Sequence, residues 1–187
     1  MRNSLGGVVS AVLGSISIVL LLSIPSATYP DPFGALWILF EGSVSLQSTF
    51  QNFINAYDGI AYITTWLLIG FAASLFSRSE WNAVRTVIWT GVSIAVLSVT
   101  SRLLTDPFFW SSTDRNIVLL VMFMSAILAS LIALVSSIPA VRIISNFRKE
   151  KDPPPPERIE TVCQCGAVYK SHPKMCAKCG RSLSHSK

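Results

Sequence analysis

The stretch IVLLVMFMSAILASLIALVSSI, residues 117–138, decides the class of this protein. It is 22 residues long and contains no ionisable side chain. Crossing the hydrocarbon core of a bilayer, which is about 30 Å thick, takes roughly 17–25 helical residues. The stretch therefore predicts a transmembrane helix, and the lipid bilayer becomes the first expected partner of the chain.

Three more apolar runs precede it, at Gly6–Ile24, Ile60–Phe76 and Val87–Thr100, and none contains Asp, Glu, Lys, Arg or His. The third is short, but it reaches spanning length if Arg85 and Arg102 extend their charged ends toward the headgroups. The chain is only 13% charged, about half the share of a soluble domain, which argues against buried helices of a soluble protein. The predicted spans are about 6–24, 60–76, 85–102 and 117–138.

Each predicted span carries small residues at helical spacing. They are Gly6, Ser10 and Gly14; Gly70 and Ser74; Gly91, Ala95 and Ser98; and Ser125, Ala129, Ala133 and Ser137. In lipid, helices associate by close backbone approach at such residues. The pattern favours a packed helix bundle, with a permeation path lined by hydroxyl groups as the alternative.

Residues 34–57 predict a further helix of a different kind. Leu46, Phe50, Phe53, Ile54 and Tyr57 recur on one helical face. The intervening polar residues make this segment a poor span. We expect an external amphipathic helix that lies on the membrane or packs on the spans, and a re-entrant course remains open.

Aromatic residues near the predicted span ends are expected to anchor the bundle at the membrane interfaces. They are Tyr29, Phe33, Trp37, Phe108, Phe109 and Trp110 on the outside and Trp81 on the inside.

The distribution of positive charge predicts the orientation. Residues 25–59 contain no Lys or Arg, whereas Arg78 and Arg85 follow the second span and Arg142 and Arg148 follow the fourth. Positive residues collect on the cytoplasmic side. A multi-pass protein of the cell membrane with both termini in the cytoplasm is therefore expected. The first run could instead be a cleaved signal peptide, but its length favours an uncleaved anchor.

The last quarter of the chain is polar and basic. Residues 139–187 carry ten Lys and Arg and four Asp and Glu. The segment RKEKDPPPPERIE contains four consecutive prolines, which favour a stiff polyproline II spacer. The expected organisation is a membrane domain, a charged and polyproline linker, a cysteine module and a short tail, at 1–144, 145–160, 161–182 and 183–187.

All four cysteines lie in the cysteine module. Cys163 and Cys165 form one close pair and Cys176 and Cys179 the other, with ten residues between the pairs. Two such pairs predict a tetrahedral zinc site, which four thiolates would saturate, so the zinc would be structural. The glycine after each pair supplies the backbone conformation of a tight turn.

The fold expected around this site is a β-hairpin in which Val168 and Tyr169 form a short strand. Iron bound by the same thiolates remains an alternative to zinc. Disulfides are disfavoured because the predicted compartment is reducing. His172 or His185 could replace one ligand.

The sequence VCQCGAVYKSHPKMCAKCGRSL, residues 162–183, resembles the short zinc-ribbon modules found on many prokaryotic, and especially archaeal, multi-pass membrane proteins. The resemblance implies a small domain that docks or stabilises proteins, and sometimes nucleic acid. It does not extend to the membrane domain.

These observations predict an all-α membrane helix bundle, with four transmembrane helices and one external amphipathic helix, followed by a β-hairpin zinc ribbon. The chain has two histidines and no HExxH motif or phosphate-binding loop, so a non-enzymatic role is expected. The ribbon would dock a cytosolic or membrane protein, or the chain would be an accessory subunit of a membrane complex. One alternative is a channel or transporter component with a regulatory ribbon. Another is a nucleic-acid tether that uses Lys170, Lys174, Lys178 and Arg181.

Overall fold

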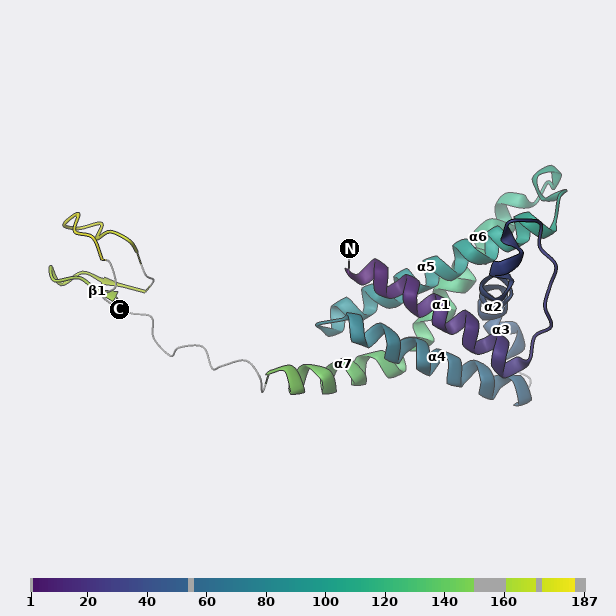
Figure 1. Cartoon of the computed structure of the whole chain (residues 1–187), viewed down its shortest axis with the longest axis horizontal. Coiled ribbons are helices and arrows are strands. Elements are labelled where there is room, and N and C mark those ends of the chain that lie inside the picture. The colour runs from purple at the N-terminus through teal and green to yellow at the C-terminus, as the bar shows by residue number, and fades with distance from the viewer. Residues whose placement is uncertain (1, 54–55, 150–160, 171–172, 184–187) are drawn as a thin grey trace. The chain divides into compact units, whose positions relative to one another are not determined.

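The computed structural model describes residues 2–53, 56–149, 161–170 and 173–183. The chain divides into two compact units, Met1–Phe147 and Arg148–Lys187, and Figure 1 shows the elements of each. The predicted polyproline spacer and the alternative ligands His172 and His185 lie outside the described residues.

Among the described residues, four helices are long and apolar enough to cross a membrane. They are α1 (Arg2–Leu22), α4 (Ala56–Phe76), α5 (Glu80–Thr105) and a continuous run of α6 (Arg115–Ser130), the 3-10 turn η3 (Leu131–Ala133) and α7 (Leu134–Lys149). The prediction of a mostly helical chain with four membrane-length helices is confirmed.

The last of these helices is longer than the span expected from sequence. It does not end at Ile138 but continues through Pro139 to Lys149. A helix rises about 1.5 Å per residue, so the helix formed by the 33 residues of Arg115–Phe147 is longer than a hydrocarbon core is thick. In α7, Arg142 Nε donates to Glu80 Oε1 at 2.6 Å, which ties this helix to the start of α5.

Helix α1 packs against α4 and α5, and α5 packs against α6. The small residues of the predicted stripes lie at these contacts. Gly6 faces Phe76, and Gly91 faces the backbone of Ile127. Close approach at small residues is what the sequence pattern predicted, and the packing of the bundle confirms it.

Residues 34–57 do not form the single external helix expected from their periodicity. The structure contains the 3-10 turn η1 (Phe33–Leu36), α2 (Trp37–Gln47) and α3 (Thr49–Asn52). Helix α2 packs against α1 and α5, and it is seen nearly end-on where α1 crosses the view in Figure 1. Phe40 and Leu46 are buried. The two alternatives expected from sequence were a helix lying on the membrane and a helix packed on the spans, and α2 packs on the spans.

The small residues of α2 explain this position. Gly42 lies directly against the backbone of Ser15 in α1. The next residue, Ser43, shares a hydrogen bond of 3.0 Å with the Ser15 hydroxyl. Periodicity identified an apolar face, but the small face of α2 decides how closely it approaches α1.

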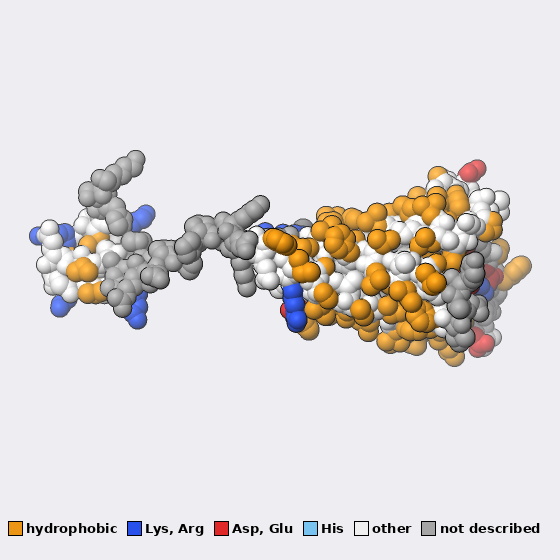
Figure 2. Space-filling model, turned by 90° about the horizontal axis from the view of Figure 1, so that it is seen from below, with side chains coloured by type: hydrophobic (Ala, Val, Ile, Leu, Met, Phe, Trp, Pro, Cys, Tyr) orange, Lys and Arg blue, Asp and Glu red, His pale blue; other side chains and the backbone are white. Residues whose placement is uncertain are grey.

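The surface of the membrane unit is apolar. Figure 2 shows hydrophobic side chains over the visible face of the bundle between its two ends. Leu20, Ile60 and Val135 are among the large apolar side chains that are more than two-thirds exposed, at 71%, 68% and 71%. An apolar surface of this extent matches a lipid environment.

The expected interface anchors divide into two groups. Trp81, Phe108 and Trp110 are exposed, as an interfacial anchor should be. The predictions for Tyr29 and Phe109 were wrong, because these side chains are only 8% and 3% exposed. The Tyr29 hydroxyl lies 2.6 Å from Glu41 Oε1 and 2.8 Å from Ser101 Oγ, so it bonds inside the bundle instead of at its surface.

Candidate metal centre

The C-terminal unit contains a short antiparallel hairpin. Its strands are β1 (Thr161–Val162) and β2 (Val168–Tyr169), with Thr161 opposite Tyr169 and Val162 opposite Val168. Val168 and Tyr169 were the predicted strand. Side chains alternate between the two faces of a strand. Val162 and Val168 therefore share one face of the hairpin, and Thr161 and Tyr169 share the opposite face.

Each cysteine pair lies on a tight turn that ends at a glycine. Gly166 N donates to Cys163 O at 2.8 Å and Gly180 N donates to Cys176 O at 2.9 Å. The φ angles of Gly166 and Gly180 are +83° and +67°. Only glycine adopts this region readily. The predicted role of both glycines is confirmed, although one turn has one residue fewer between its cysteines than the other.

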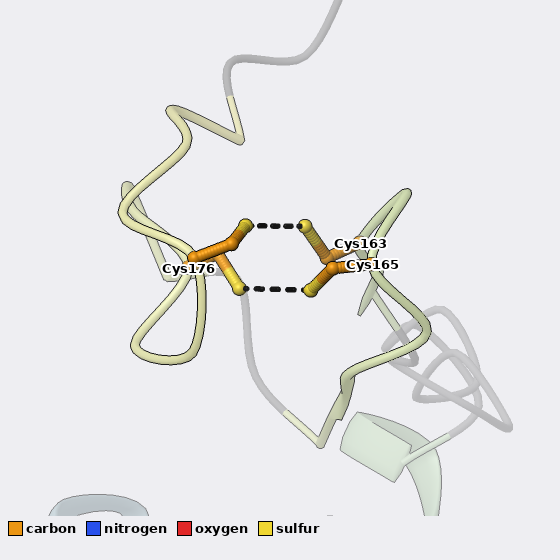
Figure 3. Close-up of side chains that lie close together, drawn as sticks. Cys163, Cys165 and Cys176 are labelled. Atoms are coloured by element: carbon orange, nitrogen blue, oxygen red, sulfur yellow. Dashed lines mark hydrogen bonds between the residues drawn. The ribbon is translucent and has the colours of Figure 1, made fainter.

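The two turns bring all four cysteine sulfurs together, as Figure 3 shows. The four Sγ atoms lie within 4.8 Å of one another and could hold a metal ion. The Sγ atoms of Cys163 and Cys179 are 3.5 Å apart, and those of Cys165 and Cys176 are 3.6 Å apart. All four are free thiols.

These distances suit a metal bound by four thiolates. Zinc–sulfur bonds of about 2.3 Å in a tetrahedron place sulfur atoms about 3.8 Å apart. The pairs at 3.5 and 3.6 Å are within a few tenths of an ångström of that separation, and no pair is more than 4.8 Å apart. The four cysteines therefore fit a tetrahedral metal ion.

Tyr169 contacts the cysteine site, although the sequence predicted only that it belongs to a strand. Its hydroxyl lies 3.1 Å from Cys176 Sγ and accepts a hydrogen bond from Ala177 N at 2.9 Å. The accepted bond leaves the phenolic proton free to donate to the sulfur. Strand alternation next to the exposed Val168 was the sequence signal that could have placed Tyr169 on the cysteine side.

The thiols of the cluster differ in acidity. The hydrogen bond from Tyr169 lowers the pKa of Cys176 to about 5, against the effect of burial. The backbone of Ala167 lowers the pKa of Cys165, but hydrogen bonds with the other three thiols raise it, for a result of about 12. The hydrogen bond from Tyr169 thus favours the thiolate form of Cys176, and the bonds with the neighbouring thiols favour the protonated form of Cys165.

Metal affinity is expected to fall on acidification. Cys165 must lose its proton to bind a metal, and every proton released on binding weakens the apparent affinity by about tenfold per pH unit of acidification. Competition of the purified full chain with a chromophoric chelator for Zn²⁺ at pH 6, 7 and 8 measures this. An affinity that is independent of pH would contradict the thiol assignment.

Tyr169→Phe should weaken Zn²⁺ binding by about tenfold at pH 7, because it removes the hydrogen-bond donor to Cys176. The same chelator competition measures this change.

The basic side chains expected to face nucleic acid are Lys170, Lys174, Lys178 and Arg181. The Arg181 guanidinium contacts the Gln164 side chain. It therefore joins the second cysteine turn to the first instead of standing free.

Comparison with known proteins adds no assignment, since no protein-family model, curated protein or solved structure matches this chain.

Proposed function

We propose that this chain is a non-enzymatic multi-pass membrane protein that presents a structural zinc ribbon on the cytoplasmic side for a protein partner. It would act as a docking protein or as an accessory subunit of a membrane complex. The convergence of four cysteine sulfurs within 4.8 Å carries the proposal. Four thiolates saturate a tetrahedral zinc ion, so no coordination position is left for a substrate.

The arrangement of arginines supports the cytoplasmic orientation. Arg78 lies in the turn between α4 and α5, and Arg2 Nε donates to Phe76 O beside that turn. Arg142 reaches the same end of the bundle through its ion pair with Glu80. Positive residues at one end favour its placement in the cytoplasm.

The exposed valine face of the hairpin supports docking of a protein. Val162 and Val168 are cross-strand neighbours, and their side chains are 63% and 59% exposed. Met175 is 62% exposed. Such a small module with apolar side chains turned to solvent suits a partner with an apolar contact surface.

Threonine in place of both valines tests this proposal. The full chain with Val162→Thr and Val168→Thr keeps β-branched residues in both strands and should retain its metal. We expect it to lose a protein that co-purifies in fixed proportion with the unaltered chain from native membranes. Metal content of the purified protein, with zinc and iron measured separately, accompanies the comparison.

A second variant separates protein docking from nucleic-acid binding. Lys174→Gln with Lys178→Gln should leave the protein partner bound. Loss of a bound nucleic acid in this lysine variant, with no effect of the valine variant on any protein, would overturn docking in favour of the tether. Nucleic-acid binding of that kind should weaken steeply with salt.

A further inference from the structure

The membrane unit contains a pocket of about 390 Å³ between α2, α5 and α6. It lies near the C-terminal end of α5, the opposite end of that helix from Glu80. Its walls include Glu41, Gln47, Ser98 and Arg102, with Val118 and Met122 of α6 on an apolar side. Seven of its ten lining residues are polar or charged, so the pocket offers hydrogen-bonding groups beside a small apolar wall.

One polar atom of this wall is buried and unpaired. Ser98 is 0% exposed, and its Oγ has no hydrogen-bond partner among the residues that the structure describes. Buried hydroxyl groups are normally satisfied, and leaving one unpaired costs free energy. The Ser98 hydroxyl at the pocket wall is therefore an unused hydrogen-bonding group.

The hydrogen bonds around Glu41 leave further acceptors free. Burial, together with the hydrogen bond to Glu41, raises the pKa of Tyr29 to about 12, so its phenol is protonated and donates to Glu41 Oε1. The single phenolic proton is then used, and Ser101 must donate to the Tyr29 oxygen. Glu41 Oε2 accepts no hydrogen bond from the described part of the chain. Gln47 Nε2 donates a hydrogen bond to Ser125 Oγ at 2.8 Å, and the Gln47 carbonyl oxygen is likewise left as an acceptor.

The charge at the pocket favours a cation. Arg102 is paired with Asp106 at 3.3 Å, whereas Glu41 has no cationic partner within residues 2–53 and 56–149. Glu41, partly buried beside α5, therefore has no ion-pair partner among these residues, and the Arg102 guanidinium on the same pocket wall is engaged by Asp106. Glu41 Oε2, Ser98 Oγ and the Gln47 carbonyl oxygen are the hydrogen-bond acceptors that these residues leave unused at the pocket wall.

We propose that the pocket between α2, α5 and α6 binds a primary ammonium group, with Glu41 as its counter-ion and Ser98 as a hydrogen-bond acceptor. Two sources offer this chemistry, the headgroup of an aminophospholipid and a free small amine. The apolar wall formed by Val118 and Met122 would contact the hydrocarbon part of either ligand. The proposal is independent of the docking function of the ribbon.

The purified full chain in detergent allows a direct test with three probes. They are phosphatidylethanolamine, phosphatidylcholine with the same acyl chains, and free ethanolamine, each followed by the rise in thermal unfolding temperature and by native mass spectrometry. Phosphatidylcholine is the matched control because its quaternary ammonium has no N–H donor. We expect ethanolamine-type ligands to bind at least about tenfold more tightly than the choline lipid. Binding of the ethanolamine lipid alone identifies a headgroup, and saturable binding of free ethanolamine identifies a soluble amine.

Two variants place the ligand in this pocket. Glu41→Gln keeps an acceptor for Tyr29 but removes the charge, and it should weaken binding by about tenfold or more. Ser98→Ala should weaken binding while leaving the unliganded chain at least as stable, since it removes an unpaired hydroxyl. Glu80→Gln, a carboxylate at the opposite end of α5, is the matched control and should bind as the unaltered chain does. Equal binding of the choline lipid, or no effect of Glu41→Gln and Ser98→Ala, would overturn the proposal.

Discussion

Replacing Cys176 with serine is expected to unfold the C-terminal module and to leave the membrane bundle folded. The module has two strands of two residues each in its described part. Cys163 and Cys176 are its fully buried apolar side chains among the described residues, so it has almost no apolar core. Zinc binding to such a module contributes about 10–16 kcal/mol of apparent free energy, far more than so small a core could supply.

Amide hydrogen exchange of the full chain in lipid nanodiscs measures this. Protection in residues 161–170 and 173–183 should be lost in Cys176→Ser, and also in the unaltered chain after removal of metal by a chelator, whereas α1 and α5 should exchange as before. The matched control is Lys178→Gln, a change in the same turn that keeps all four thiols, and it should retain both metal and protection. Protection that survives complete metal removal would show that the module folds without metal, and the metal would lose its structural role.

Replacing Gly42 with alanine is expected to lower the free energy of unfolding of the bundle by about 1–3 kcal/mol. A methyl group at this position would overlap the backbone of Ser15, whose C and Cα atoms lie 2.6 Å from it. Backbone atoms cannot move aside as a flexible side chain can. Helix propensity alone would give the opposite sign, because alanine is favoured over glycine within a helix by about 1 kcal/mol.

Gly34→Ala is the matched control for this change. The nearest atom to a methyl group at Gly34 is Tyr29 O at 3.7 Å, an ordinary contact distance. Thermal unfolding of the two variants in the same detergent should separate them clearly, with Gly34→Ala close to the unaltered chain. If Gly42→Ala were as stable as Gly34→Ala, the close packing of α2 on α1 would be wrong.

The convergence of the four cysteines was largely predictable because its information is local. Two cysteine pairs, each followed by glycine, determine two turns whatever the rest of the chain does. Both glycines adopt positive φ and the four sulfurs converge. Tyr169 could not be assigned in the same way, since its contact with Cys176 depends on how the hairpin packs on the second turn.

The class of the membrane unit was likewise determined by sequence alone. Apolar runs of bilayer length have one common solution in lipid, because a helix satisfies its own backbone hydrogen bonds. The small residues along those runs predicted close packing. They did not specify which helices would meet, since the same spacing is compatible with several partners.

Only the tertiary structure decided where the polar residues of the membrane unit lie. Tyr29 and Ser101 are 72 positions apart in sequence, and Gln47 and Ser125 are 78 apart. The periodicity of residues 34–57 indicated an external amphipathic helix, either on the membrane or packed on the spans, and could not decide between them because it counts apolar side chains and ignores partners. In the fold, α2 lies against α1 and α5, and hydroxyl groups of residues distant in sequence bond to Glu41, Ser43 and Gln47 of α2. Burial of a polar side chain is favourable only when such partners are present. The pocket beside Glu41 follows from that packing, and no local pattern in the sequence encodes it.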